Sequence, residues 1–346
     1  MDSTPYDVVI IGGGAAGLSA ATTLSRALRS VLVIDSGTPR NAPAAGVHGY
    51  LSRDGMNPRE LLSIGRSEVH SYGGEVVDGE AVSARRTTDG FEVILGDARR
   101  FSCRRLLVTT GLSDGLPPID GLQEQWGKGV VHCPYCHGWE IRGKRIGVLG
   151  TGPMSVHQAL LFRQWSPEIT LFLNDTVEPT DEEWDKLGAR SVILVDGAVA
   201  SVDSLDEVLT GVTLRQGSSF DIQALAVSTR MEARSALLES LGLSAQAHPM
   251  GVGWFIETDT TGATAVQGVY AAGNVSNLMA QVITAAAEGV MAGARINADL
   301  TEEETRWAVE GQFGPFSAAS EAAVSAIVQG HAGHRRRAAG VSSWAP

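Results

Sequence analysis

The chain has 346 residues, of which 43% are hydrophobic, and this length predicts two domains with proper hydrophobic cores. Its net charge of −12 disfavours binding to a nucleic-acid backbone, which requires a basic face. No apolar run reaches the roughly 20 residues of a membrane span, and the N-terminal residues lack a signal-peptide pattern. We therefore expect a soluble, cytoplasmic protein that contacts neither nucleic acid nor membranes.

Two βαβ units are predicted in chain order. Residues 7–11, with the sequence DVVII, form a continuous apolar run that is typical of a buried parallel strand. The turn GGGAAG follows, then an alanine-rich helix to about residue 29 and a second buried strand over residues 31–34. The same pattern recurs between residues 145 and 173, around the turn GTGPMS. Two such units predict an α/β fold with two Rossmann-like nucleotide-binding domains.

Two stretches of the chain have the composition of linkers. Residues 115–121, GLPPIDG, are rich in proline and glycine, and residues 247–253 form a second candidate. After the second linker we expect a strand over residues 254–258, the motif VYAAGN, and an alanine-rich helix over residues 279–298.

These linkers predict a discontinuous first domain. We expect it to consist of residues 1–116 and 249–300, with residues 117–248 inserted as the second domain. Residues 301–346 are expected to begin with a helical segment and to end in a mobile tail, in which the basic cluster Arg335 to Arg337 is solvated.

The first glycine motif has the form of a dinucleotide site. Gly12, Gly14 and Gly17 make the pattern GxGxxG between a strand and a helix, where they permit a tight turn, the approach of a pyrophosphate, and close helix packing. The pyrophosphate then lies at the helix N-terminus. Asp35 ends the next strand at the spacing of an acid that binds a ribose hydroxyl. The alternative is a tight glycine turn without a ligand.

Cys133 and Cys136 are two of only three cysteines and are spaced C-x-x-C in the segment CPYCH. At a helix start such a pair can close a disulfide, and the helix dipole favours the thiolate nucleophile. A zinc site would need a second pair of ligands, so we expect redox chemistry and no metal. His137 is expected to exchange protons, the alternative being a capping or solvent-facing histidine. Cys103 is expected to be an inert core thiol.

In their order along the chain, these features resemble the thioredoxin reductase family over about 300 residues. The shared parts are GxGxxG, the sequence TTG at residues 109–111, C-x-x-C ahead of the second glycine motif, and GVYAAGN before a final helix. The resemblance implies a homodimer whose first and last segments bind FAD and whose inserted domain is of the NADPH type and carries the cysteines. It also implies that Cys136 lies against the flavin while Cys133 meets the substrate.

The resemblance further implies which residues contact the FAD. They are Gly12, Gly14, Ala15, Ala16, Gly17, Asp35, Ser36, Arg40, Asn41, His48, Thr110, Gly111, Gly273, Asn274, Gln281 and Val282. The last two begin the final helix, whose positive end is expected to face the flavin and to stabilise negative charge on the reduced ring.

Departures from the family pattern narrow the expected function. Leu173-Asn174-Asp175 stands where the family has arginines for the NADPH 2′-phosphate, and an acid there repels phosphate. The usual AAGD is AAGN, Ala280 replaces the arginine of the Arg-Gln pair that follows, and His137 replaces an acid. Together with CPYCHGWE, these changes resemble the branch that contains the dithiol oxidases of the holomycin and gliotoxin pathways, with the holomycin type the more similar. That branch closes a disulfide within a small dithiol and passes electrons through C-x-x-C and FAD to dioxygen, giving hydrogen peroxide.

Two other functions stay open at this point. A disulfide reductase for a thioredoxin-like protein, supplied by NAD(P)H or another donor, is compatible with Gly150 and Gly152, and Asp175 suits the ribose of NADH. A non-catalytic flavoprotein that sequesters a reactive thiol compound is disfavoured by the intact cysteine pair.

Overall fold

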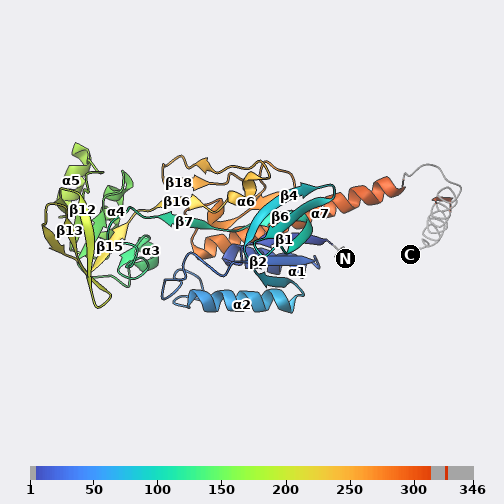
Figure 1. The fold of residues 1–346 in the computed structure, drawn as a ribbon, viewed down its shortest axis with the longest axis horizontal. Helices are drawn as coiled ribbons and strands as arrows, with labels where there is room; N and C mark the ends of the chain where they lie inside the picture. Colours follow the sequence, from blue (N-terminus) through green and yellow to red (C-terminus); the bar gives the residue numbers. More distant parts are fainter. Residues whose placement is uncertain (1–4, 313–323, 326–346) are drawn as a thin grey trace, which may run out of the picture. The chain divides into compact units, whose positions relative to one another are not determined.

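The computed structural model describes residues 5–312 and 324–325, shown in Figure 1. Residues up to Ile296 belong to one compact unit, which holds every element below except the end of the last helix. The tail that was expected to be mobile lies outside the described residues. Among the helices that are described, none is both long and apolar enough to cross a membrane.

A seven-stranded mixed sheet begins at the N-terminus. Its order is β3-β2-β1-β6-β5-β4, with a last strand, β19, also paired to β6. The strands are β1 (Tyr6–Ile11), β2 (Val31–Asp35), β3 (Glu75–Asp78), β4 (Ala81–Thr87), β5 (Gly90–Leu95), β6 (Arg100–Val108) and β19 (Val269–Ala271). Strand β1 lies between β2 and β6, parallel to both, and its central residues are fully buried. Burial on both faces explains why residues 8–11 of this strand are all apolar.

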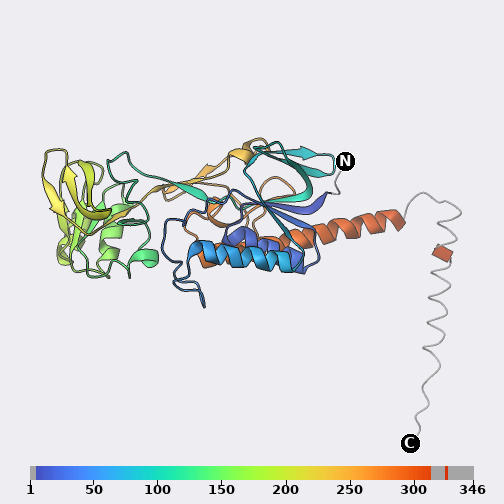
Figure 2. The ribbon, with the colours of Figure 1, turned by 60° about the horizontal axis from the view of Figure 1, so that its bottom comes forward.

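Three helices pack side by side on the first sheet, as Figure 2 shows: α1 (Ala15–Arg26), α2 (Pro58–Ser71) and the first turns of α7 (Val282–Gln312). Helices α1 and α7 approach closely, because a Cβ placed at Gly289 would lie 2.0 Å from the carbonyl oxygen of Ala16. Glycine on α7 therefore allows the two helices to touch through their backbones.

The second sheet is entirely parallel, in the order β11-β10-β9-β15-β8. Its strands are β8 (Val130–Val131), β9 (Ile146–Leu149), β10 (Ile169–Phe172), β11 (Ile193–Val195) and β15 (Ala224–Val227). One face packs on α4 (Met154–Phe162) and α5 (Asp181–Ala189). The other face packs on an antiparallel sheet of β12 (Val199–Leu205), β13 (Val208–Leu214) and β14 (Ser219–Asp221). Each large sheet thus contains one predicted βαβ unit, and the predicted α/β fold with two Rossmann-like units is confirmed.

A small sheet forms where the chain passes between the two large ones. Its order is β17-β18-β16-β7, from the strands β7 (Leu112–Gly115), β16 (Arg230–Ala233), β17 (Gln246–Ala247) and β18 (Gly253–Phe255). Leu237, Leu238 and Leu243, in and after the short helix α6 (Ala236–Glu239), lie in the core of the first sheet.

The segment after β16 therefore contributes to the core of the first sheet. The composition did not indicate this packing, because the segment LLESLGL is an amphipathic sequence that would suit the core of either sheet. The expected domain limits, with a return near Pro249, stay a proposal. The strand expected at residues 254–258 is β18, which begins one residue earlier, and the expected final helix is α7, which continues to Gln312.

Candidate active site

One cavity of about 1280 Å³ extends from the first glycine motif to the cysteine pair. It exceeds the roughly 300–1,000 Å³ of common ligand pockets and so has room for a large cofactor. Every predicted site residue lines it except Gly17. A Cβ at Gly17 would lie 1.9 Å from the carbonyl oxygen of Gly12, so this glycine serves the packing of helix on strand.

Helix α1 presents an uncapped N-terminus to this cavity. Gly14, its N-cap residue, makes no side-chain capping bond, and no atom lies within 4 Å of where its Cβ would be. Gly12 has φ +109°, and a Cβ there would lie 2.4 Å from the carbonyl oxygen of Thr109. The turn therefore requires glycine, and it leaves free backbone N–H groups that suit a pyrophosphate.

The carboxylate of Asp35 also lines the cavity, and two contacts fix its orientation. Its Oδ1 accepts a hydrogen bond of 3.1 Å from the backbone N–H of Gly13, and its Oδ2 contacts the guanidinium of Arg66. Arg66 also donates to Asp78 at 2.9 Å. The sequence did not indicate Arg66, because it comes from α2 and no motif links it to the glycine turn.

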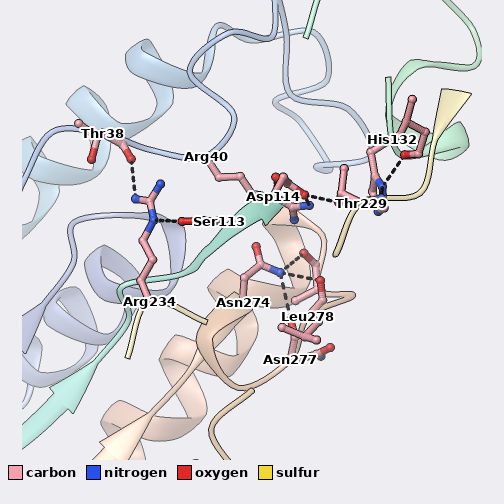
Figure 3. Close-up of polar contacts among 12 residues, drawn as sticks. Thr38, Arg40, Ser113, Asp114, His132, Thr229, Arg234, Asn274, Asn277 and Leu278 are labelled. Carbon is pink, nitrogen blue, oxygen red and sulfur yellow. Dashed lines mark hydrogen bonds and ion pairs between the residues drawn. The ribbon is translucent and has the colours of Figure 1, made fainter. Parts of the chain in front are cut away.

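The loop before α7 is held by the side-chain amide of Asn274, as Figure 3 shows. Its Nδ2 donates to the carbonyl oxygens of Asn277 at 3.0 Å, Leu278 at 3.3 Å and Ala280 at 2.9 Å. Three acceptors therefore face a position where the related pattern has an aspartate. An asparagine fits this position because its amide can donate to these carbonyl oxygens, whereas a carboxylate cannot.

Replacing Asn274 by Asp is expected to weaken FAD retention. The new carboxylate would face three carbonyl oxygens and lose the amide's bonds, at a cost of about 1–3 kcal/mol, or roughly a tenfold or greater rise in the dissociation constant. Equilibrium dialysis with flavin fluorescence measures this. Asn57→Asp is the matched control, because Asn57 caps α2 by accepting the N–H of Arg59 and aspartate caps equally well. Equal FAD affinity of both variants would contradict the prediction.

The cysteine pair lies at a short helix, α3 (Pro134–His137), with Cys133 as its N-cap. Both are half-buried free thiols. A hydrogen bond from the Cys136 thiol, aided by the backbone N–H groups of Tyr135 and Cys136 and by the charge of Arg40, lowers the pKa of Cys133 to about 7 against the effect of burial. The same thiol contact, together with burial, raises the pKa of Cys136. A low pKa makes Cys133 both a reactive thiolate and a good leaving group.

His137 lies beside the pair with a buried, unsatisfied ring nitrogen. Its Nδ1 has no hydrogen-bond partner among the described residues, and the side chain lines the cavity. Burial lowers the pKa of His137, although the charge of Glu140 opposes this. The imidazole is therefore neutral near pH 7 and can accept a proton.

Cys103 lies in the core of the first sheet, where burial raises its pKa to about 12, so the predicted core thiol is confirmed.

The second glycine turn is occupied by side chains of the protein itself. Ser155, at the third position of this motif, accepts the backbone N–H of Thr151 at 3.0 Å. Asn174 donates to the carbonyl oxygen of Gly150 at 2.9 Å and accepts the N–H of Val199 at 2.8 Å. Polar groups at this turn that could bind a dinucleotide are therefore hydrogen-bonded within the protein.

Arg234 is a cavity residue that the sequence did not indicate. Its Nε donates to the Ser113 hydroxyl at 3.0 Å and its Nη1 to the Thr38 carbonyl oxygen at 3.2 Å. It joins the returning segment to the cofactor loop (Figure 3), a contact between distant parts of the chain that no local pattern reveals.

Comparison with known proteins places this geometry in a family. The model of the pyridine nucleotide-disulphide oxidoreductases matches residues 6–289. The chain belongs to this family. Its resemblance to the thioredoxin reductase-like proteins is thereby confirmed, and it is an oxidoreductase that binds FAD. The open helix N-terminus, the Asp35 carboxylate and the size of the cavity all fit that cofactor.

Individual oxidoreductases of known sequence or structure match nearly the whole chain. Thioredoxin reductase tcpT from Claviceps purpurea is 32% identical over 88% of this chain and 98% of its own. The crystal structure of HlmI superimposes with a TM-score of 0.83 at 43% identity, covering 89% of this chain and 96% of that one. An oxidoreductase from Agrobacterium tumefaciens gives a TM-score of 0.81 at 34% identity, covering 86% and 99%.

Proposed function

We propose that the protein is an FAD-dependent dithiol oxidase, which closes an intramolecular disulfide in a small natural product of the holomycin type. One observation carries the proposal: the cysteine pair and His137 open onto the flavin cavity, while the second glycine turn is occupied by Ser155 and Asn174. This arrangement supports the entry of electrons from thiols and argues against a reducing nucleotide at the second glycine turn.

The reaction balances as a two-electron exchange. One substrate thiolate attacks Cys133 of the protein disulfide, and Cys136 leaves as a thiolate. His137 takes the proton of the second substrate thiol, which then attacks the substrate sulfur bound to Cys133 and expels Cys133. The substrate leaves as a cyclic disulfide, and the protein holds the two electrons as a dithiol. Bound FAD would supply the two-electron redox chemistry that couples the return of the cysteines to the disulfide with the reduction of dioxygen to hydrogen peroxide.

A second candidate is a disulfide reductase that works in the opposite direction. It is favoured by the relatives named thioredoxin reductase and by Gly152, where no atom lies within 4 Å of the Cβ position. In both candidates we propose a homodimer, on the family resemblance alone.

NADPH is expected to reduce the flavin poorly. Asn174 and Asp175 follow β10 with φ of +54° and +53°, and the carboxylate there repels a 2′-phosphate. An anaerobic titration compares NADPH with a small dithiol such as dithiothreitol, following the visible flavin band. We expect bleaching by stoichiometric dithiol and none by micromolar NADPH within the same time. Rapid bleaching by NADPH would instead support the reductase, and no bleaching by either would support sequestration.

A further inference from the structure

Arg40 lines the same cavity as the cysteine pair and is held there by a two-point ion pair. Its Nε donates to Oδ2 of Asp114 at 2.6 Å, and its Nη2 donates to Oδ1 at 2.7 Å. Only 6% of the Asp114 side chain and 28% of that of Arg40 is exposed. Such a bidentate contact fixes both the position and the plane of the guanidinium.

Asp114 is itself anchored by the short segment between β15 and β16, on which the chain leaves the second sheet. The Thr229 hydroxyl donates to Oδ1 of Asp114 at 2.6 Å, and Thr229 is buried. The end of β15, just before this segment, holds the residue that precedes the first cysteine, since the Val227 carbonyl oxygen lies 3.1 Å from Nδ1 of His132. Figure 3 shows Arg40, Asp114, Thr229 and His132 as one connected group. We call Arg40, Asp114 and Thr229 the arginine clamp.

The arginine clamp brings a fixed positive charge to the thiols. The charged and titratable groups that line the cavity around Cys133 are Arg40, His48, Asp114, His132, Cys136 and His137. Of these, His132 and His137 have pKa values lowered by burial, so both are neutral near pH 7. The Cys136 hydrogen bond is the largest cause of the lowered pKa of Cys133, and the charge of Arg40 acts in the same direction. At Cys136 the hydrogen bond to Cys133 and burial raise the pKa, and the charge of Arg40 opposes this rise. Arg40 is therefore the permanent cation of this group.

We propose that Asp114 and Thr229 are positioning residues, which hold the Arg40 guanidinium where it stabilises the thiolate of Cys133. A long arginine side chain left free would lose this effect to its own mobility and to water. Asp114 on β7 and Thr229 on the connection between β15 and β16 together fix the guanidinium in one place. The inference rests on the cysteine chemistry of the proposed function and does not depend on the electron acceptor.

The variant Asp114→Asn distinguishes a positioning role of Asp114 from a purely electrostatic one, because the two roles shift the pKa of Cys133 in opposite directions. If Asp114 positions Arg40, the variant releases the guanidinium, and the pKa of Cys133 rises by roughly one unit. If Asp114 acts only as a nearby anion, its neutralisation lowers that pKa. The rate of alkylation of the reduced holoenzyme by iodoacetamide, measured against pH and resolved by peptide mass spectrometry, reports the Cys133 thiolate directly.

Thr229→Val tests the second anchor and replaces the first test if Asp114→Asn does not fold. It should raise the same pKa by a smaller amount. Thr213→Val is the matched control, because Thr213 donates to Asp203 at the same 2.6 Å in the sheet of β12 to β14. The control should leave the Cys133 titration unchanged. An unchanged or lowered Cys133 pKa in the clamp variants would overturn the proposal. Since alkylation needs no turnover, failure of the proposed dithiol oxidation would show separately, in the flavin titration.

Discussion

Cys133→Ser and Cys136→Ser are each expected to lower dithiol turnover by roughly 10³-fold or more, because the exchange needs both sulfurs. The two variants should differ in colour after reduction. Serine at position 133 cannot ionise near neutral pH, so Cys136 loses the thiolate acceptor and the negative charge that raise its pKa, and the remaining thiol ionises more easily. Cys133→Ser should therefore show a long-wavelength charge-transfer band between Cys136 and the flavin, and Cys136→Ser should lack it.

Oxygen consumption with a small dithiol and visible spectra measure these outcomes. Cys103→Ala is the matched control: this thiol lies in the core of the first sheet, and its loss should leave the rate per folded enzyme unchanged. Turnover by Cys136→Ser at the wild-type rate would refute the assigned exchange.

His137→Ala is expected to slow the reaction by roughly 10²–10⁴-fold, the usual contribution of a general base. The loss should depend on pH in a defined direction. Since burial lowers the pKa of His137, the wild-type imidazole stays neutral below the ordinary histidine range and loses activity only as pH falls through that lowered value. The ratio of wild-type to variant rate should be largest between that value and the thiol pKa of the substrate, and should shrink at higher pH, where the thiol ionises unaided.

The pH dependence of kcat/KM for both enzymes measures this ratio. His157→Ala provides the control, because His157 is exposed on α4 and does not line the cavity. A variant profile parallel to that of the wild type would show that His137 transfers no proton in the rate-determining step.

Local patterns in the sequence predicted most of the fold and the ends of the cavity. The glycine turn at Gly12, the acid at Asp35 and the cysteine pair each depend on residues close in sequence, so spacing alone indicates their chemistry. Arg66, Arg234 and Asp114 act through partners that lie 31 to 121 residues away in the sequence. Local sequence patterns do not predict such pairings, because the partners come together only when the chain has folded.

The late position of several core residues of the first sheet has a consequence for folding during synthesis. All five strands of the second sheet lie between residues 130 and 227, so that sheet is complete before the first one can be. The core of the first sheet still lacks Leu237, Leu238 and Leu243 at that point, and β6 lacks its partner β19. We therefore expect the middle of the chain to fold first on the ribosome. Until residues 237–271 have been synthesised, strands β1, β2 and β6 expose apolar surface. This stage of synthesis is the one most prone to aggregation.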